Sequence, residues 1–247
     1  MHGGFRLTPE ILLSAYAEGL FPMAERRGDP NLYWISPEAR GVIPLDAFHV
    51  PRRLARTVRS ERFEVRTDTS FEEVIRACAA PGPERSESWI NDEIVSLYTA
   101  LHARGFAHSI ECWREGKLVG GLYGVRLGAA FFGESMFSIE RDASKVALVH
   151  LVARLIRGNF RLLDAQFLTA HLARFGALEI TKREYLARLK DAISHDAEFY
   201  CPAPSGSSTF SSMAPALGDT ALTVSVEATG GPSWPGWLVL QAITETS

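Results

Sequence analysis

Two short apolar segments of the sequence carry polar side chains that could do chemistry. Strand-like alternation puts Glu134 and Met136 on one face of the first segment, and Asp164 and Gln166 on one face of the second. A carboxylate on a core strand costs free energy to bury unless it has a partner, so such groups are usually functional or paired. For Asp164, a pair with Arg161 or a hydrogen bond to the following turn is the structural alternative to a catalytic role.

Other common catalytic arrangements are not indicated. His108 and Ser109 are adjacent on a predicted strand, so they point to opposite faces and cannot form a nucleophile–base pair. The histidines show neither metal-site spacing nor pairing with cysteines, so we expect no metal. The three cysteines, Cys78, Cys112 and Cys201, are odd in number and far apart, which argues against a disulfide framework.

The elements that must position these side chains are predicted by turns and periodicity. Tight turns separate three strands, 107–113, 118–127 and 129–137, which indicates an antiparallel meander. A long helix over 143–157 and a strand over 161–167 follow. This order predicts an α+β fold with a mixed, mainly antiparallel sheet, similar to that of acetyltransferases.

Residues with short polar side chains precede several of the predicted helices. Thr8, Asn91 and Asp142 each stand where a side chain could accept a hydrogen bond from the first turn. We therefore expect helix caps at these three positions, and a further helix that starts at Ser70.

Composition divides the chain into three parts. Residues 21–51 hold five prolines and predict a compact, loop-rich unit, after which the strongly periodic segments begin. Residues 201–247 are rich in Gly, Pro and Ser and predict a loosely ordered tail, with a possible strand at 222–226.

Charge follows a similar division. The net charge of −3 argues weakly against a nucleic-acid partner, but residues 191–247 contain six acids and neither Lys nor Arg, which leaves residues 1–190 at +3. A candidate basic patch for a nucleic-acid backbone consists of Arg52, Arg53, Arg56, Arg59, Arg62 and Arg66. An ordinary solvated helix face is the alternative for each of them.

A coenzyme A-dependent acetyltransferase is the first function to test against such a fold. These enzymes cradle the pyrophosphate with a glycine-rich loop before a helix, whereas residues 137–144 contain no glycine. Coenzyme A is therefore disfavoured, although backbone amides at this helix start could hold an anion.

The sequence also resembles a known family through a series of ordered motifs. They are AYAEGLFPM (15–23), WISP (34–37), RGVIP (40–44), SWI (88–90), HSIE (108–111), LVGGLYG (118–124), FGESMF (132–137), ASK (143–145), LDAQ (163–166), TAHL (169–172) and FGALEI (175–180). Over about residues 7–190 the chain is similar to the bacterial leucyl/phenylalanyl-tRNA–protein transferases. This resemblance implies a small N-terminal domain over 1–50 and an acetyltransferase-like catalytic domain over 51–200. The tail beyond residue 200 has no counterpart in this resemblance.

The resemblance implies an enzyme that transfers Leu or Phe, and less readily Met, from aminoacyl-tRNA to proteins that begin with Lys or Arg. The transfer marks these proteins for degradation through the N-degron pathway. We expect a monomeric cytoplasmic protein without a cofactor or a membrane anchor, whose activity survives removal of the tail near residue 200. A non-enzymatic aminoacyl-tRNA-binding adaptor is the remaining alternative, which the presence of both Asp164 and Gln166 disfavours.

The same resemblance implies roles for individual residues. Asp164 and Gln166 would be the catalytic pair, with Gln166 orienting the attacking amine and a proton passing between the two or through water. Glu134 would help position the aminoacyl or adenosine end. The remaining substrate-binding residues would be Met23 and Trp89 for the terminal adenosine of the tRNA, and Met136, Leu122, Leu148 and Leu151 for the amino-acid side chain. The arginine patch would hold the tRNA backbone.

Overall fold

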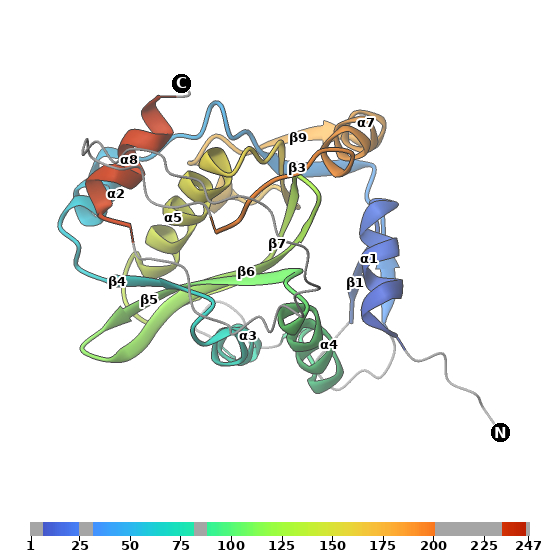
Figure 1. The fold of residues 1–247 in the computed structure, drawn as a ribbon, viewed down its shortest axis with the longest axis horizontal. Helices are drawn as coiled ribbons and strands as arrows, with labels where there is room; N and C mark the ends of the chain where they lie inside the picture. Colours follow the sequence, from blue (N-terminus) through green and yellow to red (C-terminus); the bar gives the residue numbers. More distant parts are fainter. Residues whose placement is uncertain (1–6, 25–31, 82–87, 201–233, 246–247) are drawn as a thin grey trace, which may run out of the picture.

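A seven-stranded mixed sheet organises the computed structural model, which describes residues 7–24, 32–81, 88–200 and 234–245 (Figure 1). In spatial order the strands are β4 (Glu64–Thr67), β5 (Ala107–Arg114), β6 (Lys117–Leu127), β7 (Ala130–Ser138), β8 (Leu162–Gln166), β3 (Ala39–Ile43) and β9 (Leu178–Thr181). Neighbouring strands are antiparallel except β7 and β8, which are parallel. The predicted α+β class and mainly antiparallel sheet are therefore confirmed.

The meander β5–β6–β7 forms where the sequence places left-handed turns. Glu115 and Gly116 have φ values of 52° and 73°, which is the conformation of the tight hairpin turn between β5 and β6. Gly128, with a φ of 54°, lies in the turn between β6 and β7. The two turns fix the order of the three strands.

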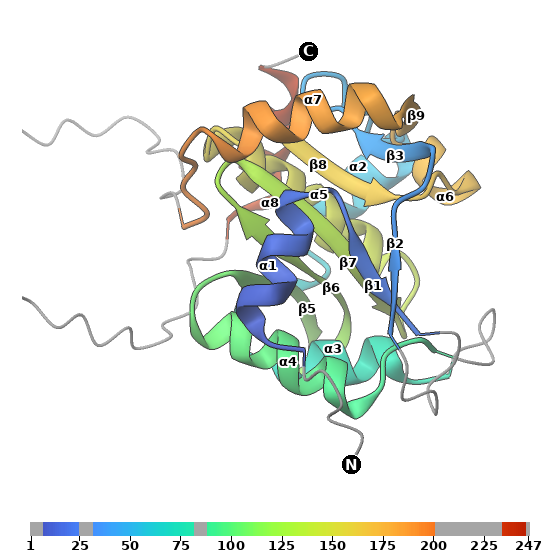
Figure 2. The ribbon, with the colours of Figure 1, turned by 90° about the vertical axis from the view of Figure 1, so that its right-hand side faces the viewer.

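Helices cover both faces of the sheet and create two apolar cores. One core contains residues of α2 (Arg52–Arg59), α5 (Ala143–Arg157) and α8 (Gly236–Thr244). The opposite core contains residues of α1 (Pro9–Ala17), α3 (Phe71–Ala79), α4 (Asp92–Ala103) and α7 (Lys182–Ile193), and Figure 2 shows α1, α3 and α4 together. The remaining elements are the short helix α6 (Ala170–Ala173) and a separate two-stranded sheet of β1 (Phe21–Met23) and β2 (Tyr33–Ile35). No helix in the described ranges is both long and apolar enough to span a membrane.

Two of the three predicted helix caps are confirmed. The Thr8 hydroxyl accepts a hydrogen bond from the Ile11 amide at 3.4 Å, and the Asn91 side chain accepts one from the Ile94 amide at 2.9 Å. The helix predicted to start at Ser70 is also confirmed, since α3 begins at Phe71.

The capping role predicted for Asp142 is wrong. Asp142 has a φ of 72° and its side chain makes no capping hydrogen bond to α5. Its carboxylate instead pairs with Lys145 and Arg53, each at 3.2 Å. The Ser138 hydroxyl accepts a hydrogen bond from the Ser144 amide at 3.3 Å in its place.

The proline-rich first 50 residues contribute a strand to the main sheet. Strand β3 lies between β8 and β9, antiparallel to both. Gly41 allows this packing, because a Cβ atom there would lie 2.5 Å from the backbone of Phe167. The position of β3 next to β8 therefore depends on backbone pairing and close backbone approach as well as on side chains.

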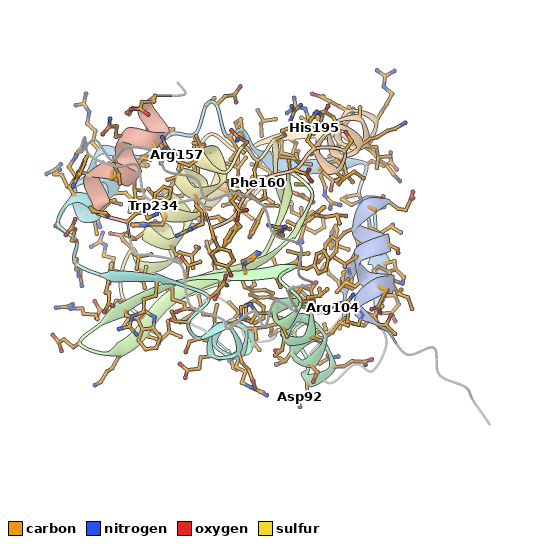
Figure 3. The ribbon with its side chains drawn as sticks, in the orientation of Figure 1. Asp92, Arg104, Arg157, Phe160, His195 and Trp234 are labelled. Atoms are coloured by element: carbon orange, nitrogen blue, oxygen red, sulfur yellow. The ribbon has the colours of Figure 1, made fainter. Side chains whose placement is uncertain are left out.

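Part of the tail is packed rather than loosely ordered. Residues 201–233, including the predicted strand at 222–226, lie outside the described residues. Helix α8 buries Leu238, Val239 and Ile243 against α5 and α2 because its apolar residues recur at helical spacing, and Trp234 lies between α8 and α5 (Figure 3). A truncation near residue 200 would therefore expose apolar surface of the core.

Candidate active site at the ends of strands β7 and β8

The candidate site forms where the parallel strands β7 and β8 stop pairing. Their ladder ends at the pair Phe132–Asp164. Just beyond it, the pairing of β7 with β6 passes from Ser135 directly to Gly133, so Glu134 is an extra residue in a β-bulge. A bulge re-aims the side chains on the strand that carries it.

Because of this bulge, Glu134 and Met136 lie on opposite sides of the sheet, so the prediction that they share a face is wrong. The Glu134 carboxylate contacts Tyr16 of α1 and Tyr98 of α4 on one side of the sheet. Met136 packs against the core on the α5 side. Strict alternation predicted one face because it assumes a regular strand.

A second irregularity shapes the end of β8. Its register with β3 shifts so that Ala165 has no partner, and Gln166 adopts a left-handed φ of 63°. Ala165 packs toward the α5 side, whereas Asp164 contacts α7 and Gln166 reaches Glu134. The predicted common face of Asp164 and Gln166 is confirmed.

Asp164 forms a fully buried ion pair with Arg40 of β3. The Arg40 Nε and Nη2 atoms donate to the two carboxylate oxygens at 2.9 and 2.6 Å, and the two side chains are only 1% and 0% exposed. The guanidinium carbon lies 4.5 Å from the ring centre of Phe21 and 4.4 Å from that of Tyr185. Nη1 donates to the Gly19 carbonyl at 3.1 Å. Burial alone would lower the pKa of Arg40, but the hydrogen bonds and charge of Asp164 raise it.

Two further donors complete the surroundings of Asp164. The Tyr185 hydroxyl donates to Oδ2 at 2.8 Å, and the Gln166 backbone amide donates to Oδ1 at 2.8 Å. The alternative pair with Arg161 is not formed, because Arg161 pairs with Asp191 at 3.1 Å. The alternative hydrogen bond to the following turn is present, since it is the one from Gln166.

Glu134 joins this ion pair to two tyrosines. Its Oε1 atom accepts hydrogen bonds from the Tyr16 hydroxyl at 2.6 Å and from the Gln166 side-chain amide at 3.0 Å. Its Oε2 atom lies 3.3 Å from the Tyr98 hydroxyl, and the two tyrosine hydroxyls are 2.6 Å apart. Burial raises the pKa of Glu134 from 4.5 to about 7, against the hydrogen bond from Tyr16, which lowers it.

Four residues of this cluster were not predicted as site residues. Arg40 gave the clearest signal, because it is a lone cation in the short strand sequence ARGVI. Tyr16, Tyr98 and Tyr185 gave a weaker signal, since each occupies an apolar position of a helix, which predicts a core residue. Their hydroxyl partners come from distant segments, which periodicity does not reveal.

The other predicted substrate-binding residues lie on opposite sides of the sheet. Met23 and Trp89 are partly buried against the core on the Glu134 side. The predicted side-chain pocket gathers in one apolar cluster on the α5 side, formed by Met136, Leu122, Leu148 and Leu151. The ends of β7 and β8 separate the two groups.

The six predicted patch arginines divide into two sets. Three line a groove of about 520 Å³ together with residues of α8, namely Arg52, Arg56 and Arg59. Three form ion pairs with acidic side chains, namely Arg53 with Asp142, Arg62 with Glu140 and Arg66 with Glu64. The groove set leaves its cations available to a polyanion, because the described part of the chain offers it no ion-pair partner.

A search for metal-binding geometry gives no candidate in the ranges that the structure describes. No three His, Cys, Asp or Glu side chains gather there as a metal site would require. The candidate site is thus a cluster of ion pair, amide, carboxyl and phenol groups.

Comparison with known proteins shows the family of the chain. Residues 42–190 match the family model described as leucyl/phenylalanyl-tRNA protein transferase, and residues 5–38 match the model of its N-terminal domain. The chain is 65% identical to the leucyl/phenylalanyl-tRNA–protein transferase of Phenylobacterium zucineum over 189 residues, or 76% of this chain and 86% of the relative. It is 59% identical over 193 residues to that of Paramagnetospirillum magneticum, with 78% of this chain and 92% of the relative covered.

These matches define an enzyme class, the aminoacyltransferases. Within that class, the chain belongs to the leucyl/phenylalanyl-tRNA protein transferase family. Glu134, Asp164 and Gln166 lie inside the segment matched by the larger family model. Their partner Arg40 lies two residues before the start of that segment.

Proposed function

We propose that this chain transfers Leu or Phe, and less readily Met, from aminoacyl-tRNA to the α-amino group of proteins that begin with Lys or Arg. The transfer would mark those proteins for degradation through the N-degron pathway. Membership of the family supports the reaction class, and the joined groups Asp164, Gln166 and Glu134 at the strand ends carry the assignment of the site. We place the reaction in the cytoplasm, with the chain acting as a monomer.

The chemistry requires little beyond positioning. An aminoacyl ester is already activated, so neither ATP nor a metal is needed. The attacking α-amine has an ordinary pKa of about 7.7–8.0, so a usable fraction is neutral near neutral pH. Gln166 would orient this amine, and Asp164 would fix Gln166 through the 2.8 Å hydrogen bond to its backbone amide.

The apolar residues are proposed to hold the donor. Met23 and Trp89 would pack against the terminal adenosine of the tRNA. The side chain of Leu or Phe would enter the cluster on the α5 side, at Met136, Leu122, Leu148 and Leu151. An apolar pocket separates substrates by only about 1–3 kcal/mol per methylene, so slow transfer of Met is expected.

The arginine patch is proposed to bind the tRNA backbone, with the α2 set contributing most. Arg56 and Arg59 line the groove beside α8, whereas Arg62 and Arg66 are neutralised by acidic partners. Each phosphate-contacting cation contributes about one unit to the slope of log affinity against log salt. We expect Arg56→Glu with Arg59→Glu to weaken tRNA binding and flatten that slope, and Arg62→Gln with Arg66→Gln to change both less. Equal effects of the two pairs would contradict this division.

The transfer assay that tests the function uses two labels at once. Leu-tRNA labelled on Leu and acetyl-coenzyme A labelled on acetyl are offered with a peptide that begins with Arg, alongside an otherwise identical peptide that begins with Ser. We expect only Leu to move, and only to the Arg peptide. Transfer of acetyl would indicate an acetyltransferase, and tight tRNA binding without transfer would indicate an adaptor.

A further inference from the structure

The carboxylate of Asp164 has no lone pair to offer a substrate proton. A carboxylate has about four lone-pair sites. Arg40 Nε, Arg40 Nη2, the Tyr185 hydroxyl and the Gln166 backbone amide occupy them, and the side chain is 0% exposed. A proton on Asp164 would displace one of these donors and leave the buried Arg40 without its counter-charge. Asp164 is therefore a fixed support for Gln166.

The side chain of Gln166 cannot replace it as a proton acceptor. Its Nε2 atom donates to Glu134 Oε1 at 3.0 Å, and an amide is neutral. Gln166 thus links the fixed carboxylate of Asp164 to a second carboxyl group, that of Glu134. The hydrogen bonds continue from Glu134 to Tyr16 and Tyr98.

Glu134 differs from Asp164 in both access and hydrogen-bond capacity. It is only partly buried. Its Oε1 atom accepts from Tyr16 and Gln166, but within the described residues Oε2 has only the 3.3 Å contact to Tyr98. Glu134 therefore retains a free lone pair on Oε2, in a residue that is less buried than Asp164.

The two tyrosines leave room for one additional proton. Tyr16, Tyr98 and Glu134 form a closed ring of three oxygen–oxygen contacts, at 2.6, 2.6 and 3.3 Å. Two hydroxyl groups supply only two hydrogens, so an ionised Glu134 leaves one of the three contacts without a hydrogen. A proton on Glu134 Oε2, donated to Tyr98, completes the ring.

We propose that Glu134 is the catalytic proton acceptor and donor of the transfer reaction, an inference that rests on the function proposed above. The amine nitrogen would bond to the ester carbon while its proton moves to Glu134 Oε2 and the carbonyl electron pair moves to oxygen. The intermediate then collapses, the bond from carbon to the ribose oxygen breaks, and Glu134 returns the proton to that oxygen. One N–C bond forms, one C–O bond breaks, and the proton passes from nitrogen to oxygen.

The groups that face Glu134 are consistent with this cycle. Burial raises the pKa of Glu134 to about 7, where a group can both take and return a proton near neutral pH. Burial raises the pKa values of Tyr16 and Tyr98 well above 10, so both keep their hydrogens. The remaining charged groups nearby are Asp164 and Arg40, which neutralise each other, and the phenol Tyr185 also has a raised pKa.

The test is a single-turnover measurement of Leu transfer to an Arg peptide at pH values below and above 7. In the wild type both Glu134 and the amine must lose a proton, so log rate should rise with pH at a slope of about 2 on the acid side. At saturating Leu-tRNA, Glu134→Gln should lose about 10²–10⁴-fold in rate and follow a slope of about 1. Glu134→Asp, which keeps the carboxyl group, should retain the slope of the wild type. Asp164→Asn should also retain it, even where it slows the reaction.

Glu111→Gln provides the matched control, since Glu111 is a buried glutamate on β5 whose partners are Thr69, Ser70, Ser109 and Trp113. It should leave both the slope and the rate unchanged. The proposal is overturned if Glu134→Gln keeps the wild-type slope, if it only weakens tRNA affinity, or if Asp164→Asn lowers the slope instead.

Two further readings keep the test decisive. If Glu134→Gln does not fold, Tyr16→Phe removes the 2.6 Å hydrogen bond to Oε1 that lowers the pKa of Glu134, and the acid limb should move to higher pH. An unmoved limb overturns the proposal. If the wild type itself transfers no Leu, the proposed function has failed, which is a different result.

Discussion

Two buried aspartates in the sheet region have similar surroundings, but only one adjoins the candidate site. Asp68 follows β4 and accepts hydrogen bonds from His108 Nδ1 at 2.7 Å, from the Ser109 amide at 2.6 Å and from the Tyr200 hydroxyl at 2.5 Å. Asp164 likewise accepts several hydrogen bonds, from Arg40, the Tyr185 hydroxyl and the Gln166 backbone amide. Burial and a strong partner therefore do not by themselves distinguish a site carboxylate from a structural one.

Access separates the Asp68 cluster (Asp68, His108, Tyr200) from the Asp164 cluster (Arg40, Asp164, Gln166, Glu134). Asp68 and His108 are 5% and 1% exposed, and His108 stacks on Phe199 with ring centres 3.9 Å apart, so the chain covers the carboxylate and the imidazole; within this cluster only the phenol Tyr200 reaches the surface, at 42% exposure. In the other cluster, the hydrogen-bond path leads outward to the partly exposed Glu134. We infer that the first cluster fixes residues 199 and 200 on the sheet, and that the second is built to meet a substrate.

The strongest way to break this comparison is to remove the cation of the Asp164 cluster. Arg40→Met would leave Asp164 buried and unpaired, and breaking a buried pair in this way costs about 3–5 kcal/mol. Chemical unfolding followed by circular dichroism measures the loss. Arg161→Met is the control, because Arg161 and Asp191 are 47% and 54% exposed and such pairs contribute about 0–1 kcal/mol. A similar small effect of both variants would show that Arg40 is not the main support of Asp164.

The two clusters should respond to pH in opposite directions. The pKa of Glu134 is raised from 4.5 to about 7, so its contribution to stability is full below pH 4.5 and is lost as pH rises through 7. Burial lowers the pKa of His108 below 6.5 despite the opposing effect of Asp68, so stability from that cluster is lost as pH falls below 6.5. In a variant that lacks the Glu134 carboxyl group, the pH dependence of stability that remains should be that of the Asp68 cluster.

Glu134→Gln therefore gives the second prediction. Between pH 4.5 and 7 the free energy of unfolding of the wild type should fall relative to that of the variant, by about 3 kcal/mol in all at about 1.4 kcal/mol per pKa unit. Urea titrations of both proteins at several pH values measure this difference. A difference that does not change with pH would mean that the carboxyl group titrates normally in the folded protein.

The contrast between the clusters also shows what the sequence can and cannot predict. The meander, helix α5 and the common face of Asp164 and Gln166 follow from local turns and periodicity, and the structure has all three. The split between Glu134 and Met136 does not follow, because a β-bulge changes the faces without leaving a mark in the hydrophobic pattern.

Long-range partners account for most of what was missed. Arg40 lies 124 residues before Asp164, in a segment whose prolines predicted loops rather than a central strand. Helix α8 was hidden in a tail of low-complexity composition, although Leu238, Val239 and Ile243 are spaced as on one helical face. Both cases depend on which distant surface the segment meets, and that information is not local.

The smallest of the expected effects tests the structural role of the Asp68 cluster. Asp68→Asn should weaken the hydrogen bonds to His108 and Tyr200 and lower stability by about 1–3 kcal/mol, because it leaves buried groups imperfectly paired. At temperatures where the variant is folded, the rate of Leu transfer should equal that of the wild type, whereas Asp164→Asn should lower both stability and rate. If Asp68→Asn slows transfer in the folded protein, access is not what separates the two clusters. The Asp68 cluster would then have to act on the site at a distance, for which α4 offers a path, since His102 lies 3.7 Å from Asp68 and Tyr98 on the same helix contacts Glu134.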